Sequence, residues 1–261
     1  MQAIETFAQG RLLGILSGDP QAGGPVLVLP NAGLVPRAGP FRLYVDIAQR
    51  LEAAGVRTFR FDLPGAGEAP FVGGIDGAAA TRLALDHLAA RGIADAFVVG
   101  GLCSAADRGW IAAGEDERVR GVLMIDGLCF KGPWYYLGFA RDLLRRPARQ
   151  WRDTLRRRFE GSDERGPPTA LFRGWPTRAQ ARTELRAMLD RDVRLLLVYT
   201  GGIGEYLRDA RQFRWSFGDA VDDPRVSLHH WRDCDHTFYS RARRERLLDA
   251  VSQWFEGFGG G

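Results

Sequence analysis

Val98-Val-Gly-Gly-Leu-Cys103 runs directly into Ser104-Ala-Ala-Asp-Arg-Gly-Trp-Ile-Ala-Ala113. The first segment is short and apolar, and the second is rich in small residues at helical spacing. The pair therefore predicts a buried strand, a tight turn and a helix. This order is typical of a nucleophile elbow, in which a sharp turn holds one reactive side chain above the end of a sheet.

The spacing of small residues identifies Cys103 as the residue at the turn. An elbow needs small residues two positions before and after the nucleophile, because the backbone comes too close there for large side chains. Gly101 and Ala105 occupy these positions around Cys103, whereas a nucleophile at Ser104 would place Leu102 at the first of them. The N–H of Ser104 then lies where a donor to an oxyanion is expected. The alternative is a buried, inert thiol.

Apolar runs alternate with helical patterns through most of the chain, which is typical of βαβ units around a parallel sheet. The predicted strands are residues 26–29, 56–61, 96–99, 122–125, 195–199 and, more weakly, 226–231. Residues 127–190 interrupt this alternation and are rich in arginine and aromatic residues. We expect a helical cap at 127–190, inserted into a core formed by residues 1–126 and 191–261; a set of ordinary crossover connections is the alternative.

Four motifs follow one another in a recognisable order. They are Asn31-Ala-Gly-Leu-Val-Pro-Arg-Ala-Gly-Pro-Phe-Arg-Leu-Tyr44, Phe59-Arg-Phe-Asp-Leu-Pro-Gly-Ala-Gly67, Gly101-Leu-Cys-Ser104 and Asp235-His-Thr-Phe238. Together they resemble the α/β-hydrolase superfamily, and most of all its serine-aminopeptidase-like and exosortase-associated hydrolases. The resemblance covers residues 11–255 except the cap. It implies an α/β-hydrolase fold: a mostly parallel sheet with helices on both faces and an inserted helical cap.

The resemblance also assigns roles around Cys103. The order of motifs in the superfamily places the catalytic base after the last strand, where His236 stands. Asp126, at the end of strand 122–125, and Glu205, in the glycine-rich loop after strand 195–199, both remain candidates for the acid that orients the base. We favour Asp126, because Glu205 could simply serve the start of a helix. The first oxyanion donor is expected at Ala32 or its neighbour Gly33.

Two departures from the superfamily pattern bear on the reaction. Gly65-Ala-Gly-Glu-Ala69 replaces the usual Gly-x-Gly-Asp-Ser, and the usual aspartate after Tyr199 is missing. Superfamily members with a cysteine elbow include aminoacyl shuttle enzymes, which move acyl groups between phosphopantetheine arms of carrier proteins. We therefore expect an enzyme that transfers acyl or aminoacyl groups through a Cys103 thioester. A small-molecule ester or thioester hydrolase is one alternative, and a non-catalytic binding protein of this fold is another.

The uneven distribution of charge along the chain suggests an acidic binding partner. Residues 141–191 hold 14 arginines against 7 acidic residues, whereas the whole chain, with 36 basic and 32 acidic residues, has a net charge of only +4. A basic cap could steer an acidic carrier protein to the site, and Arg156, Arg157 and Arg158 are the candidate contacts. A solvated cap face is the alternative interpretation.

Several function classes are not indicated. No apolar run approaches the length of a membrane span, and residues 1–10 show no secretion signal. Because 35 of the 36 basic residues are arginine, the basic balance reflects composition as readily as nucleic-acid binding. Three cysteines do not form a disulfide framework. We expect a cytoplasmic protein whose chemistry needs neither metal nor cofactor.

Overall fold

The sheet is the centre of the molecule. The computed structural model describes residues 2–71, 73–144 and 173–258. The strands are β1 (Gln2–Phe7), β2 (Leu12–Ser17), β3 (Val26–Pro30), β4 (Thr58–Phe61), β5 (Phe97–Leu102), β6 (Val119–Ile125), β7 (Arg194–Thr200) and β8 (Val226–Trp231). They form one eight-stranded sheet in the order β1-β2-β4-β3-β5-β6-β7-β8. The contacts of β1 with β2 and of β2 with β4 are antiparallel, and all others are parallel.

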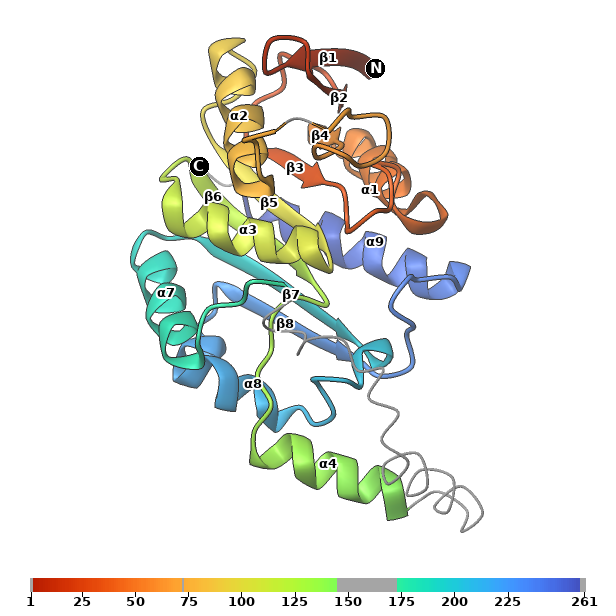
Figure 1. Ribbon diagram of the computed structural model, residues 1–261, viewed down its shortest axis with the longest axis vertical. Helices are drawn as coiled ribbons and strands as arrows, with labels where there is room; N and C mark the ends of the chain where they lie inside the picture. Colours follow the sequence, from red (N-terminus) through yellow and green to blue (C-terminus); the bar gives the residue numbers. More distant parts are fainter. Residues whose placement is uncertain (1, 72, 145–172, 259–261) are drawn as a thin grey trace.

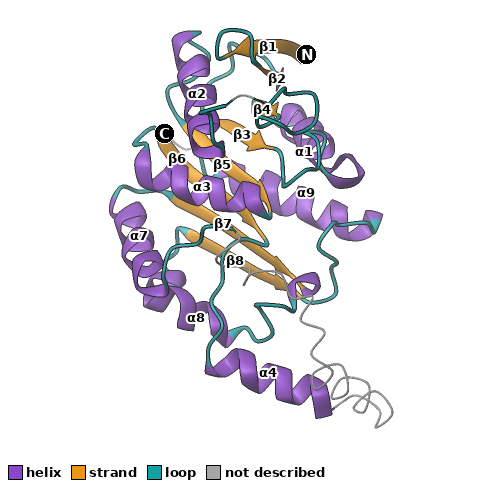
Figure 2. Cartoon of the chain, in the orientation of Figure 1, coloured by secondary structure: helices purple, strands orange, loops and turns teal. Residues whose placement is uncertain are grey.

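Helices cover both faces of this sheet (Figure 2). The α-helices are α1 (Leu43–Ala53), α2 (Gly77–Ala90), α3 (Ser104–Glu115), α4 (Pro133–Leu144), α7 (Arg178–Asp190), α8 (Arg211–Phe217) and α9 (Arg241–Glu256). The short 3-10 turns are η1 (Pro40–Arg42), η2 (Gly201–Ile203) and η3 (Gly218–Asp222). Helices α1 and α9 share one apolar cluster with the sheet, and α2, α3, α7 and α8 share the other.

The alternating direction of side chains along the buried strands explains why each strand contributes to both apolar clusters. Successive side chains of a strand point to opposite faces, so a strand covered on both sides needs apolar residues at every position. Strand β3 meets this requirement: Val26 and Val28 join the cluster of α2 and α3, whereas Leu27 and Leu29 join that of α1 and α9. The strands predicted from the sequence are confirmed, with ends shifted by a few residues.

The antiparallel pair β1 and β2 was not predicted from the sequence. In β1 only two positions, Glu5 and Phe7, are buried, and the others are exposed or half-buried. An edge strand with one half-covered face lacks the continuous apolar run that marks the central strands. Strand β1 forms the edge of the sheet next to β2, four strands from β5, which precedes Cys103.

Two described pieces belong to the stretch 127–190 predicted as a cap. Helix α4 lies at one end of the molecule beside α8, as Figure 1 shows. Helix α7 packs against α3 and α8, and its buried residues Ala181, Leu185 and Met188 belong to the same cluster as the inner residues of β7. The division of the chain into core and cap stays a prediction. Within the described ranges, no helix is long and apolar enough to cross a membrane.

Candidate active site

Cys103 stands on the predicted sharp turn between β5 and α3. Its backbone has φ 57° and ψ −120°, a conformation that a residue with a side chain rarely adopts. The turn also explains the small residues around it. A Cβ atom on Gly101 would lie 3.2 Å from the Cβ of Ala105 and 2.3 Å from the hydroxyl of Tyr44. The spacing that identified Cys103 therefore has a direct steric cause.

Hydrogen bonds fix this turn to its neighbours. The buried Tyr44 hydroxyl, from α1, accepts the N–H of Leu102 at 2.8 Å, so the residue before the nucleophile is held from the opposite layer. The N–H of Cys103 donates to the carbonyl of Ile125 at 2.8 Å, which continues the ladder between β5 and β6. Cys103 and the residue after Ile125, Asp126, consequently end adjacent strands.

Asp126 and His236 form the second part of the site. The His236 Nδ1 atom lies 2.7 Å from Oδ2 of Asp126, whose side chain is fully buried. The His236 ring and the Cys103 thiol are near enough that each changes the pKa of the other. Cys103, His236 and Asp126 thus lie in the order nucleophile, base and orienting acid.

Asp126 is held rigidly by the strand next to it. Thr200, the last residue of β7, donates its N–H to Oδ1 and its hydroxyl to Oδ2, both at 2.7 Å. The Asp126 backbone is left-handed, with φ 52°, and its N–H donates to Val198. Glu205, the other predicted acid, is exposed on the segment that follows η2. The structure therefore brings Asp126, rather than Glu205, to the His236 ring.

The charges of this group favour an ion pair between Cys103 and His236. Burial opposes the thiolate, but the hydrogen bond from His236 and the charges of Arg173 and His236 lower the pKa of Cys103. Burial likewise opposes the imidazolium, but the contacts with Asp126 and Cys103 raise the pKa of His236 to about 9. A cysteine with a lowered pKa is an activated nucleophile near neutral pH.

Arg173 is a residue of the site that sequence reasoning missed. It belongs to the arginine-rich stretch 141–191, which the sequence suggested as a charged surface, yet only 6% of its side chain is exposed. Its Nε donates to Asp107 at 2.5 Å, and its terminal nitrogens donate to the backbone carbonyl of Asp126 at 3.2 and 3.3 Å. Burial raises the pKa of Asp107 to about 6, against the effect of Arg173. Composition could not separate this one arginine from the others of the stretch.

The loop after β3 approaches the turn from the side. Asn31 donates to the carbonyl of Gly33 at 2.7 Å and accepts the N–H of Leu63 at 2.8 Å, which fixes the loop. The N–H of Gly33 donates to the Ser104 hydroxyl at 2.8 Å, so it is already occupied. Ala32, which pairs with Val35 in an isolated bridge, remains the candidate donor of this loop. The N–H of Ser104 belongs to the first turn of α3, where no intrahelical acceptor exists.

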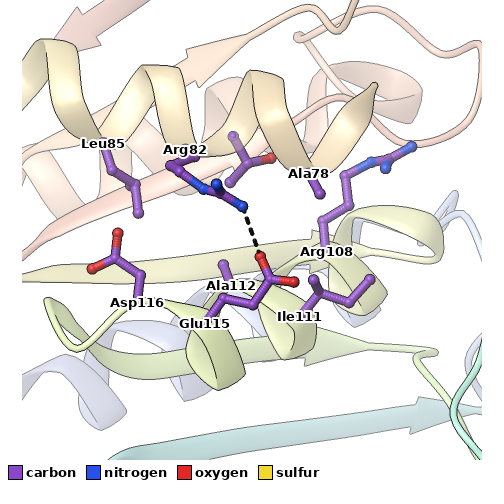
Figure 3. Close-up of a pocket in the computed structure, with 9 residues that line it drawn as sticks. Ala78, Arg82, Leu85, Arg108, Ile111, Ala112, Glu115 and Asp116 are labelled. Carbon is purple, nitrogen blue, oxygen red and sulfur yellow. Dashed lines mark hydrogen bonds and ion pairs between the residues drawn. The ribbon is translucent and has the colours of Figure 1, made fainter. Parts of the chain in front are cut away.

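The predicted partner contacts and one surface depression are the remaining candidate sites. Arg156, Arg157 and Arg158, the predicted contacts, fall outside the described residues. Figure 3 shows a depression between α2 and α3 that is bridged by the ion pair of Arg82 with Glu115. Its volume of about 10 Å³ has room for a water molecule only, and it contains none of the three groups at the elbow. Within residues 2–71, 73–144 and 173–258, no cluster of His, Cys, Asp and Glu could hold a metal ion.

Comparison with known proteins identifies solved structures with a similar fold. No protein-family model and no curated protein sequence matches the chain. Solved structures do. An esterase from Pyrococcus furiosus matches with a TM-score of 0.65 and 13% identity over 100% of this chain and 91% of that chain. The esterase domain of a Rhodothermus marinus protein has a TM-score of 0.56 and 16% identity over 100% and 99% of the two chains.

A mouse protein, α/β hydrolase domain-containing protein 10, matches in the same way. Its TM-score is 0.56 at 12% identity, and the match covers 98% of this chain and 99% of that one. Likeness at such low identity concerns the arrangement of strands and helices and not the reaction. The sheet order, the turn at Cys103 and these matches together show that the chain has the α/β-hydrolase fold.

Proposed function

We propose that the protein is an enzyme that transfers acyl groups through a thioester on Cys103. The observation that carries the proposal is the contact chain from Cys103 to His236 to Asp126 at the end of three parallel strands. A binding protein without activity has no need for a strained nucleophile, a base and a buried acid in register. These contacts therefore favour catalysis over the non-catalytic alternative.

The proposed first step forms the acyl-enzyme. The Cys103 thiolate attacks the carbonyl carbon of a thioester or ester, and the N–H groups of Ala32 and Ser104 stabilise the resulting oxyanion. When the carbon–sulfur or carbon–oxygen bond to the leaving group breaks, His236 donates its proton to that group. The products are acyl-Cys103, neutral His236 and a free thiol or alcohol.

The second step releases the acyl group. An acceptor thiol, amine or water loses its proton to His236 and attacks acyl-Cys103, and the Cys103 thiolate leaves beside the reformed imidazolium. Acylation removes the negative charge of Cys103, one of the contacts that raise the pKa of His236. The pKa of His236 is therefore lower in the acyl-enzyme than in the free enzyme, so near neutral pH more of the ring is neutral and able to accept a proton.

A thioester is the proposed acyl donor. Exchange of one thioester for another is nearly neutral in energy, and a thiolate leaving group needs little help from an acid. Hydrolysis of a small ester is the second candidate, because two solved structures with the same fold are described as esterases. The two candidates share every catalytic group and differ in the acceptor.

A phosphopantetheinylated carrier protein is the proposed partner. The proposed location is the cytoplasm, whose reducing conditions suit a thiolate nucleophile. The described arginines of 141–191 give this partner little support, since Arg173, Arg178 and Arg182 contact other parts of the same chain. The proposed docking charges are Arg156, Arg157 and Arg158.

Intact-mass spectrometry tests the reaction. The protein is mixed with an acyl-pantetheine thioester, with and without an acceptor thiol such as a second pantetheine. An adduct of the acyl mass that disappears only when the acceptor is added supports transfer. An adduct that decays at the same rate with and without acceptor supports hydrolysis. Absence of an adduct from both the wild type and His236→Ala would contradict transfer and hydrolysis alike.

A further inference from the structure

A groove of about 560 Å³ lies on the α1 side of β4, away from the Cys103 thiol. Its walls come from β4, from the loop that precedes α1 and from α1 itself, which lie together in Figure 1. Three arginines line it, Arg37, Arg42 and Arg60, together with one acidic residue, Glu68. Neither the proposed reaction nor the motifs of the sequence assign a role to this groove.

Arg60 is the unusual member of the set. It stands on β4 and is 3% exposed, and its Nε is buried without a hydrogen-bond partner. In the described part of the chain no carboxylate forms an ion pair with it. Burial, and then the like charges of Arg37 and Arg42, lower the pKa of Arg60. A buried guanidinium that lacks an acceptor is unfavourable unless an anion joins it.

Arg57, three residues earlier, shows how the same fold normally satisfies a buried arginine. It is also 3% exposed, and its Nε likewise has no partner within the described residues, but its terminal nitrogens donate to the backbone carbonyls of Pro20, Gly24 and Ile93. Arg60 has no comparable set of acceptors. The difference leaves the terminal nitrogens of Arg60 available to a ligand.

The neighbouring charges define how much positive charge is available. Arg37 is already paired, with the buried Asp62 at 2.5 Å and with Glu68 at 2.5 Å. Arg42 is exposed and, like Arg60, forms no ion pair within the described ranges. Arg42 and Arg60 are therefore left without a carboxylate partner in this part of the chain, while the five groups together, with Asp62 and Glu68, carry a net charge of +1. The paired N–H donors of a guanidinium suit the oxygens of a phosphoryl group.

The backbone around Arg42 supports a built site. Phe41 and Arg42 are both left-handed, with φ of 48° and 66°, and such consecutive strained residues persist only where the surroundings impose them. The same loop begins at Gly33, whose N–H contacts Ser104. Arg37 follows Gly33 by four residues and so lies within about 14 Å of it.

We propose that Arg42 and Arg60 form a binding site for a phosphoryl group, which is either inorganic phosphate or the phosphate of a larger substrate. The site goes beyond the proposed acyl transfer and stands without it, since it rests on the groove and its unpaired guanidinium groups. The loop shared with Gly33 gives it a route to influence the oxyanion donors.

Thermal unfolding and calorimetric titration test the site with inorganic phosphate as the probe, against sodium chloride and sodium acetate at equal ionic strength. Phosphate is expected to raise the Tm more than either salt does. Arg60→Met, which keeps the length of the side chain, should weaken phosphate binding at least tenfold and raise the Tm in chloride alone. Arg42→Gln, at an exposed position, should weaken binding while the fold is kept.

Arg82→Gln is the matched control, because it removes one exposed arginine from α2, outside the groove. It should leave phosphate binding unchanged. A second arm compares 4′-phosphopantetheine with pantetheine: tighter binding of the phosphorylated form, lost in Arg60→Met, identifies a substrate phosphate, and equal binding identifies free phosphate. The proposal is overturned if phosphate has no more effect than acetate, or if Arg60→Met and Arg42→Gln bind phosphate as the wild type does.

Discussion

The N–H of Gly33 donates a hydrogen bond to the Ser104 hydroxyl at 2.8 Å and so joins the loop after β3 to the first residue of α3. Each of these two segments carries one of the proposed oxyanion donors, Ala32 and Ser104. Their distance from each other therefore depends on a side chain that takes no part in the reaction. Such fixed donors stabilise a developing charge without reorganisation during the step.

Ser104→Ala should slow acylation while Cys103 is still acylated. The variant keeps the Ser104 N–H but leaves the Gly33 N–H without its acceptor, so the loss should stay below the roughly 10²-fold effect of deleting an oxyanion donor outright. Stopped-flow measurement of the acylation rate checks this. An adduct that is lost in Ser104→Ala but kept in Cys103→Ala would assign the nucleophile to Ser104 instead.

Iodoacetamide near pH 7 should modify Cys103 much faster than the other two cysteines. Burial raises the pKa of Cys129 to about 12 and also raises the pKa of Cys234, whereas contacts with His236 and Arg173 lower that of Cys103. Peptide mapping after brief alkylation gives the three rates. Cys103→Ala serves as the control, and fast modification of Cys129 or Cys234 in the wild type would contradict the assignment.

The acylation rate should follow a bell-shaped pH profile. The thiolate is lost as the pH falls through the lowered pKa of Cys103, and the imidazolium is lost as the pH rises through about 9, the pKa of His236. Asp126→Asn removes a contact that raises the His236 pKa, so the upper limb should move to lower pH. An upper limb that stays in place in Asp126→Asn would show that another group sets it.

Asp126→Asn and Glu205→Gln together test which carboxylate acts. Asp126 lies 2.7 Å from the His236 ring, so its amide variant should reduce kcat/KM by about 10²- to 10⁴-fold. Glu205 is exposed, and its variant should change kcat/KM little. Circular dichroism of both variants confirms that each is folded. A large loss only in Glu205→Gln would reverse the assignment.

Arg173→Gln should destabilise the protein and raise the pKa of Cys103. The variant leaves the buried Asp107 without its partner at 2.5 Å, and loss of one member of a buried ion pair costs about 3–5 kcal/mol. Denaturant unfolding measures the stability, and the pH dependence of alkylation measures the pKa. Asp107→Asn in the same chain should restore much of the stability but only part of the thiol reactivity, which returns in part because Asp107 itself raises the pKa of Cys103; full restoration of both would limit Arg173 to a structural role.

The central fold and the sharp turn at Cys103 could be predicted because each leaves a local pattern. Buried strands such as β3 are apolar at every position, and the turn at Cys103 demands small residues at fixed spacing, as the close approach of Gly101 to Ala105 shows. Strand β1, at the edge, is half-covered and has no such run, whereas β2 has the apolar run Leu12-Leu-Gly-Ile-Leu16, which was not assigned to a strand from the sequence.

The acid and Arg173 depend on contacts between distant segments, which a single sequence does not contain. Asp126 and Glu205 could not be separated before the register of β6 and β7 placed Thr200 against Asp126. The structure shows why the loop after β7 is rich in glycine. A Cβ on Gly202 would lie 2.6 Å from the backbone nitrogen of His236, so the absence of a side chain there makes room for the segment that carries the histidine.

The bond from the Cys103 N–H to the Ile125 carbonyl has a consequence for how the enzyme would fail on heating. Cys103 and Asp126 are anchored to one ladder, that of β5 and β6, and cannot move apart unless the centre of the sheet unfolds. His236 belongs to a separate turn, in which the N–H groups of Thr237 and Tyr239 donate to the Asp235 carboxylate and the N–H of Gly201 donates to the carbonyl of Cys234. Local unfolding of that turn would abolish the proposed activity while the rest of the molecule stays folded. Inactivation should thus precede denaturation, and residues 232–239 are the place where reinforcement would extend the working temperature.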